Sequence, residues 1–212
     1  MTEPISSVLR NSSRPAHTEA ENSGFIVKLM RGQLSLDAYK KYLVNMAWLY
    51  AALEEQSSTG APRPTTELIW DPRLERLESI TQDLENLGVS DWATTTKPTS
   101  AMQSYINHLK ALDGRSDLRL VAHHYTRYLG DLSGGQAIAA LVARHYQAAP
   151  EQLNFYNFTK IDDLVRYKEH YRSALDAIDV KDQELETLVA EVKLAFEFNQ
   201  KVFEDLDVQL AA

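Results

Sequence analysis

The stretch VAHHYTRYLGDLSGGQ, residues 121–136, contains the feature that decides how this chain folds. Gly130, Gly134 and Gly135 interrupt a segment in which apolar residues otherwise recur at helical spacing. A glycine inside a helix costs about 1 kcal/mol relative to alanine, and it is often kept where something approaches the backbone closely. Gly130 and Gly134 are four residues apart and share one face, with Asp131 between them. The pattern predicts a helix with a bare wall beside a carboxylate, which suits a flat ligand.

The same glycines have a second interpretation, which is close packing between helices. Two small residues four apart more often let a neighbouring helix approach than line a ligand. Spacing alone favours the packing interpretation, so residues elsewhere in the chain have to decide between the two.

Composition limits the class of protein. The chain has 212 residues, of which 44% are hydrophobic and 25% charged, as is ordinary for one globular domain. Thirty acidic against 22 basic residues argue against a nucleic-acid binder, because neutralising phosphates requires a basic surface. The lack of cysteine excludes disulfides, thiolate metal sites and cysteine nucleophiles, and it agrees with a reducing cytoplasm.

The two ends of the chain show no targeting signal. The first residues, MTEPISSVLRNSS, lack the apolar core of a signal peptide. No apolar run approaches the ~20 residues that span a bilayer, and the ending EDLDVQLAA is short and acidic. We therefore expect a cytoplasmic protein without a membrane anchor.

Apolar residues recur at steps of three and four almost throughout, which predicts an all-α protein. The predicted helices are about 39–53, 74–87, 102–112, 118–146, 161–175 and 185–206. Proline- or glycine-containing breaks lie at 61–64, 71–72, 97–98, 113–114 and just before 150. We expect about seven helices in one domain.

Among the six histidines, His17 has the most suggestive neighbour, because Glu21 lies one helical turn further along the same face. An imidazole bound to a metal usually donates its other ring N–H to a carboxylate or carbonyl. The pair fits a metal-binding histidine whose ring is held by a carboxylate. A histidine and a glutamate at this spacing are, however, more often an exposed pair on the protein surface. The chain has no Glu-x-x-His pair and no HExxH motif, which argues against di-iron bundles and common zinc proteases.

Lys168 and Arg172 form a second pair at this spacing, with Tyr171 beside them. Like charges repel mildly in a bare helix, but an anion lying across them would make the pair favourable. Arginine in particular can hold a carboxylate through two hydrogen bonds. Taken alone, the pair is more simply a solvated basic face.

At VAHHYTRYLGDLSGGQ the chain closely resembles the haem oxygenase family. Further matching segments follow in the expected order along nearly the whole chain: AHTEAEN at 16–22, LYAALEE at 49–55, SAMQSYI at 100–106, YKEHYRSAL at 167–175 and LAFEFNQKVFEDL at 194–206. The resemblance implies an all-α, single-domain haem oxygenase-like bundle over residues 1–212, with a core at about 8–207 and a glycine-kinked distal helix. Because its ending is short and acidic, the chain resembles a soluble, bacterial member of the family.

The resemblance implies roles for residues on both sides of the haem. His17 matches the proximal ligand of the iron, and Glu21 matches the residue that supports it. Gly130 and Gly134 match the glycines of the distal helix, and Asp131 matches the distal carboxylate that holds water. The residues that match the hydrogen-bond network around this water are Tyr50, Arg127 and Asn199. Those that match the groups holding the haem propionates are Arg10, Tyr125, Lys168 and Arg172.

Two positions depart from the family pattern. Pro15 stands two residues before His17, where a proline removes a backbone donor and can kink or restart the helix. The register of Arg10, seven residues before His17, depends on that outcome. Asp163 lies about one turn before Lys168, where some bacterial relatives have a basic residue, so the anchoring of the propionates can differ.

The resemblance implies an enzyme that cleaves haem b with O2 to biliverdin, carbon monoxide and ferrous iron, in the service of iron acquisition. Haem is then both substrate and cofactor. Electrons come from a separate donor, a flavoprotein reductase or a ferredoxin, and we expect the enzyme to be a monomer.

Three other functions compete with this interpretation. A haem-binding or haem-transfer module is the main alternative, and Asp131 argues against it because storage needs no distal proton relay. A thiaminase-like enzyme of similar helical architecture would need a cysteine nucleophile, which the chain lacks. A purely structural bundle leaves the glycines, His17 and the cationic pair without a common explanation.

Overall fold

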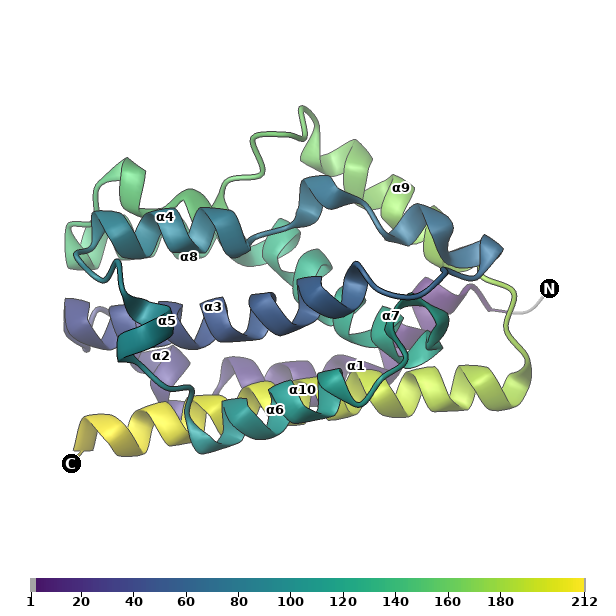
Figure 1. The fold of residues 1–212 in the computed structure, drawn as a ribbon, viewed down its shortest axis with the longest axis horizontal. Coiled ribbons are helices and arrows are strands. Elements are labelled where there is room, and N and C mark those ends of the chain that lie inside the picture. The colour runs from purple at the N-terminus through teal and green to yellow at the C-terminus, as the bar shows by residue number, and fades with distance from the viewer. Residues whose placement is uncertain (1–2, 212) are drawn as a thin grey trace.

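A computed structural model describes residues 3–211, and these residues form an all-α fold (Figure 1). Met1, Thr2 and Ala212, which belong to the predicted domain 1–212, lie outside the described residues. Ten α-helices and no strand occur within 3–211, which confirms the predicted class. The number exceeds the seven or so expected, partly because α2 and α5 are short helices that the periodicity did not reveal.

The bounds of the helices are as follows. The longer ones are α1 (Ile5–Glu21), α3 (Leu36–Ser57), α8 (Gly130–Tyr146) and α10 (Asp182–Ala211). The shorter ones are α2 (Gly24–Met30), α4 (Leu77–Asn86), α5 (Trp92–Thr95), α6 (Ser100–Lys110), α7 (Leu118–His124) and α9 (Leu164–Asp176). Short 3₁₀ turns lie at Pro64–Ile69, Pro72–Leu74, Gly114–Ser116, Pro150–Gln152 and Asn154–Tyr156. Every helix of the described chain is too short or too polar to cross a membrane.

Helix α10 runs along nearly the whole length of the molecule, and α1, α2, α6 and α7 all pack against it (Figure 1). Helix α3 crosses the middle of the molecule, in contact with α4 on one side and α6 on the other. Its apolar residues follow a spacing of three and four, and the whole row is buried: Tyr39, Leu43, Met46, Tyr50 and Leu53. Because α3 is covered on nearly all sides, its side chains form the centre of the core.

Two helices begin later than the periodicity predicted, and a capping aspartate explains one of the starts. The helix expected from residue 161 begins at Leu164, because Asp163 accepts hydrogen bonds from the backbone N–H groups of Val165 and Arg166, both at 3.0 Å. The helix expected from residue 74 begins at Leu77, after a 3₁₀ turn that ends at Leu74.

The predicted helix 118–146 is continuous but not uniform. Helix α7 passes into a π-helical turn at Tyr125–Leu129, and α8 starts directly after it at Gly130. The backbone of Gly130, with φ −62° and ψ −51°, is ordinary α-helix. The irregular turn therefore precedes the glycines, and π turns are rare features that occur frequently at functional sites.

Candidate active site

The glycine wall of α8 faces open space. A Cβ atom added at Gly130 or at Gly134 would have no neighbour within 4 Å. A Cβ at Gly135 would instead meet the ring of Tyr156 at 3.5 Å. Gly130 and Gly134 are thus not kept for close packing against another helix, which removes the interpretation that spacing alone had favoured. Only Gly135 packs against a neighbour, as that interpretation requires.

A buried hydrogen-bond network begins one residue after Gly130. The Asp131 carboxylate accepts a hydrogen bond from the Tyr50 hydroxyl, and the Arg127 guanidinium lies 3.6 Å from its other oxygen. Arg127 also donates to the Tyr50 hydroxyl at 3.3 Å and to Asn199 Oδ1 at 3.0 Å. Asn199 is held in turn by donating to the Ala195 carbonyl at 2.7 Å. The fold thereby joins α3, the π turn, α8 and α10 around one carboxylate.

The electrostatics of this network shift the Asp131 carboxyl group toward its protonated form. Burial raises the pKa of Asp131 above its ordinary value, and Arg127 and the Tyr50 hydroxyl oppose that shift without cancelling it. Burial also raises the pKa of Tyr50 far above its usual range. Burial alone would lower the pKa of Arg127, but the charges of Tyr50 and Asp131 raise it, so this side chain remains a cation.

Two further residues of α3 belong to the network, although the sequence marked them only as part of the predicted helix 39–53. Arg127 donates to the Met46 sulfur at 3.5 Å. Burial raises the pKa of Tyr42 to about 12, and the nearby charges of Arg127 and Asp131 act on it as well. Tyr42, Met46 and Tyr50 are spaced by four residues on one face of α3. That regular row is the signal that could have identified them.

His17 lies near the C-terminal end of α1, where its side chain is half-exposed. Its Nδ1 atom lies 3.2 Å from the Glu21 carboxylate, so Nε2 is the ring nitrogen left for a metal ion. The ring packs edge-on against Phe196 of α10, with centroids 5.5 Å apart. Phe196 was not predicted, because no local spacing links it to residue 17.

The predicted cations converge where α1, the π turn and α9 meet. Burial raises the pKa of Tyr125, while the charges of Arg172 and Arg10 lower it, as does a hydrogen bond with the Ser13 hydroxyl. Arg10 and Arg172 are therefore close enough to Tyr125 to act on it from two different helices. Lys168 is half-buried one turn before Arg172 on α9.

The two departures from the family pattern have structural explanations. Helix α1 continues through Pro15, so Arg10 and His17 lie two turns apart in one unbroken helix. The Ser6 backbone N–H and hydroxyl both donate to Asp176 at the end of α9, at 2.7 and 3.0 Å, which joins the two helices that carry the cations. Asp163 is occupied as the N-cap of α9, so its charge serves the helix end.

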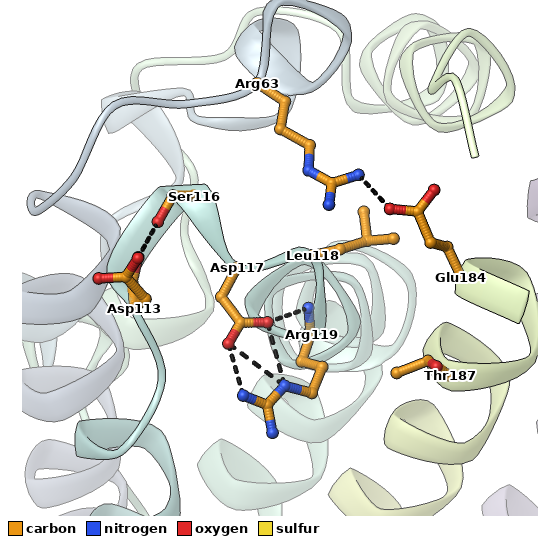
Figure 2. A pocket seen from close by; sticks show the side chains of 8 residues that line it. All are labelled: Arg63, Asp113, Ser116, Asp117, Leu118, Arg119, Glu184 and Thr187. Atoms are coloured by element: carbon orange, nitrogen blue, oxygen red, sulfur yellow. Dashed lines mark hydrogen bonds and ion pairs between the residues drawn. The ribbon is translucent and has the colours of Figure 1, made fainter. Parts of the chain in front are cut away.

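Two hollows open on the described surface. Figure 2 shows the first, in which Arg63 pairs with Glu184 at 2.8 Å and Arg119 pairs with Asp117 at 2.6 Å. Its cations are thus already neutralised by side chains of the hollow itself. The second lies beside Arg73, Tyr167 and His170. No residue predicted for the site lines either hollow.

Comparison with known proteins places the chain in a family. Residues 3–205 match the model of the heme oxygenase family. The chain is 34% identical to a heme oxygenase of Porphyra purpurea, over 98% of this chain and 88% of that protein. Its sequence is 32% identical to that of heme oxygenase-1 from the cyanobacterium Synechocystis. The crystal structure of that protein in complex with heme matches this fold with a TM-score of 0.92, over 99% of this chain and 95% of that one. The structure of heme oxygenase from Leptospira interrogans gives a TM-score of 0.85 at 31% identity, over 95% of this chain and 98% of that one. The chain belongs to the haem oxygenase family.

Proposed function

We propose that this chain is a haem oxygenase that cleaves haem with O2 and external electrons to biliverdin, carbon monoxide and ferrous iron. Membership of the family supports the activity. The observation that carries it in this structure is the open space at Gly130 and Gly134, directly beside the buried network of Asp131. A haem carrier would have no use for a buried carboxyl held in position by Tyr50 and Arg127.

The donor atoms present fit a haem group. His17 would coordinate the iron through Nε2 while Glu21 fixes its ring, and neutral imidazole is a common proximal haem ligand. Arg10, Lys168 and Arg172 would hold the two propionates by charge-assisted hydrogen bonds, with Tyr125 beside them. When bound, haem supplies the iron that activates O2 and the ring carbon that is oxidised.

The chain itself contributes space, position and a proton. Gly130 and Gly134 leave room on the distal side and carry no side chain that could bind iron. Asp131 holds a water molecule and delivers a proton through it from its carboxyl oxygen. Tyr50 and Arg127 keep that carboxyl in one place, and Asn199 keeps Arg127 in place. This preorganisation means that the groups need no rearrangement when the proton moves.

The partner of the reaction is an electron-donor protein, a flavoprotein reductase or a ferredoxin. The cations of α1 and α9 support this part of the proposal, because a positive rim steers an acidic donor to the haem edge. We place the enzyme in the reducing cytoplasm as a monomer that serves iron acquisition, in agreement with the absence of cysteine.

The test is the optical spectrum of the protein with one equivalent of hemin, followed after ascorbate or a reductase is added in air with catalase present. We expect the Soret band to decay while the absorption of biliverdin grows. Hemin that binds through histidine but stays intact under these conditions would favour a carrier and contradict the role of Asp131. Failure to form any Soret complex would contradict haem as the substrate.

A further inference from the structure

A second cluster of metal-binding side chains lies outside the proposed haem site, where α6, α7 and α10 meet. His108 Nε2 lies 2.5 Å from Glu191 Oε1, and His123 Nε2 lies 2.8 Å from the same oxygen. One ligand atom from each of the three residues lies within 4.8 Å of the others. The three residues come from three helices, so the tertiary fold alone creates this arrangement.

The surroundings of the cluster orient its donor atoms. The Tyr105 hydroxyl is hydrogen-bonded to His123 Nδ1 at 2.9 Å, which directs Nε2 of that ring at Glu191. Phe198 stacks on Tyr105 with centroids 4.6 Å apart and lies 5.3 Å from the His108 ring. His123 is fully buried, whereas the His108 side chain is 24% exposed and gives the cluster contact with solvent.

Burial and the hydrogen bonds within the cluster shift the pKa values of its groups. Burial raises the pKa of Glu191, but hydrogen bonds with His123 and His108 outweigh it, so the pKa lies below its ordinary value and the group is a carboxylate. Burial lowers the pKa of His123 more than Glu191 raises it. Arg119 is the nearby cation, and it is already paired with Asp117 at 2.6 Å.

We propose that His108, His123 and Glu191 form a binding site for one divalent transition-metal ion of the Zn²⁺ type. Two imidazoles and one carboxylate are ligands that Zn²⁺ prefers, and three protein ligands leave a fourth position for water. Bonds of about 2.0–2.2 Å place tetrahedral ligands about 3.3 Å apart, so each imidazole nitrogen has to move away from Glu191 Oε1 by less than about 1 Å. On binding, the proton of the His123 ring moves from Nε2, which takes the ion, to Nδ1. The Tyr105 hydroxyl then changes from hydrogen-bond donor to acceptor.

An ion here would join α6, α7 and α10, of which α10 carries Asn199 and α7 leads directly into the π turn that carries Arg127. His123 lies one turn before Arg127, and Glu191 lies two turns before Asn199. A bound ion would therefore restrict the motion of α7 relative to α10, and so help to keep Arg127 in contact with Asn199. This inference does not rest on haem binding, and it is tested without haem.

The experiment is a calorimetric titration of the full-length chain with Zn²⁺ after dialysis against a chelator. His17 is first replaced by alanine, because His17 and Glu21 form another histidine–carboxylate pair that could bind the probe. We expect His17→Ala to bind one Zn²⁺ and to show a raised Tm when the ion is present. Adding His108→Asn should weaken binding by more than about 100-fold, because loss of a partner that only supports a ligand already costs about 10- to 100-fold.

Matched variants separate binding from folding. Tyr105→Phe keeps all three ligands and should weaken Zn²⁺ binding by about 10-fold. His170→Ala removes an exposed histidine of α9 and should change nothing. Co²⁺ in place of Zn²⁺ should give the visible absorption of a tetrahedral ion. If His17→Ala binds no Zn²⁺, or if His108→Asn binds it as tightly, the site does not exist.

Discussion

At the level of single residues, Asp131 is the group on which the proposed chemistry depends most. Its carboxyl group is largely buried and has two polar neighbours, Tyr50 and Arg127. Burial raises its pKa, which is the shift expected for a carboxyl group that acts as a proton donor near neutral pH.

Replacing Asp131 with alanine should leave hemin binding intact and abolish normal turnover. Loss of a proton-transfer group commonly costs about 100-fold or more in rate. The hemin complex should instead oxidise an added phenol in the manner of a peroxidase, because the activated oxygen is no longer directed at the porphyrin ring. The Soret band measures binding and the absorption of biliverdin measures turnover. An unchanged yield of biliverdin would show that another group supplies the proton.

His17→Ala should remove the axial ligand of the iron. The Nε2 atom of this residue is the only donor that Glu21 orients, so the hemin complex of the variant should lose its histidine-ligated spectrum and its normal turnover. His170→Ala, an exposed histidine on α9, serves as the control. If the axial-ligand spectrum of His17→Ala matches that of the unmodified chain, a different histidine binds the iron.

At the level of elements, the helix 118–146 combines features that a stable isolated helix would avoid. It contains a π turn at Tyr125–Leu129, then two glycines that face open space. Both features weaken a helix, and both lie beside the Asp131 network. We interpret them as the cost of leaving room on the distal side.

Gly134→Ala tests this interpretation, because folding and function should respond in opposite directions. The new methyl group meets nothing within 4 Å, so the haem-free protein should gain about 0.5–1 kcal/mol in its free energy of unfolding. The methyl group projects into the proposed haem space, so biliverdin formation should fall. Urea unfolding and the hemin assay measure the two effects.

Gly135→Ala is the control, since its methyl group meets Tyr156 at 3.5 Å, an ordinary contact outside that space. Biliverdin formation should persist in it. If Gly134→Ala loses stability in the absence of haem, the glycine is a packing residue after all.

Asp83 fastens α4 to the segment that follows α8. Its fully buried carboxylate accepts hydrogen bonds from the backbone N–H groups of Asn154 and Phe155, at 2.7 and 2.8 Å, and from the Asn154 side chain at 2.9 Å. Asp83→Ala leaves these donors without a partner and should lower the free energy of unfolding by about 3 kcal/mol. Asp37→Ala, on the exposed start of α3, should change it by less than about 0.5 kcal/mol. Chemical unfolding of both variants measures the difference, and equal losses would contradict it.

At the level of the whole molecule, His124 makes stability depend on pH. It is buried between Tyr171, whose hydroxyl lies 2.8 Å from Nδ1, and Trp70, whose ring lies 5.1 Å away. Burial lowers its pKa to about 3, and the charge of Asp71 offsets this only in part. The ordinary value in an unfolded chain is about 6.5.

Between these two values the unfolded chain binds a proton that the folded chain does not. The free energy of unfolding should therefore be highest above about pH 6.5, and this residue should lower it by up to about 1.4 kcal/mol for each pH unit below that. His124→Gln should remove that share of the slope. Urea unfolding at about pH 7 and at about pH 5 provides the test, and identical slopes for the two proteins would contradict it.

Features that depend on spacing within one helix were accessible from the sequence. The all-α class followed from apolar steps of three and four residues, and the pairing of His17 with Glu21 followed from a separation of four. Such neighbours are set by helix geometry, which is the same in every fold. The resemblance added Tyr50 and Asn199, which no local spacing connects to Asp131. It also singled out Arg127, which lies four residues before Asp131.

The tertiary structure alone decided which helices meet and what faces open space. It placed Arg127 against Asn199, 72 residues away, and brought Arg10 to Tyr125 through an unbroken helix that Pro15 left uncertain in the sequence. It also placed His108 and His123 on one oxygen of Glu191, and left Gly130 and Gly134 uncovered. Contacts between helices depend on how side-chain ridges of distant segments fit together, and this fit is a property of the packed molecule that no short stretch of sequence contains.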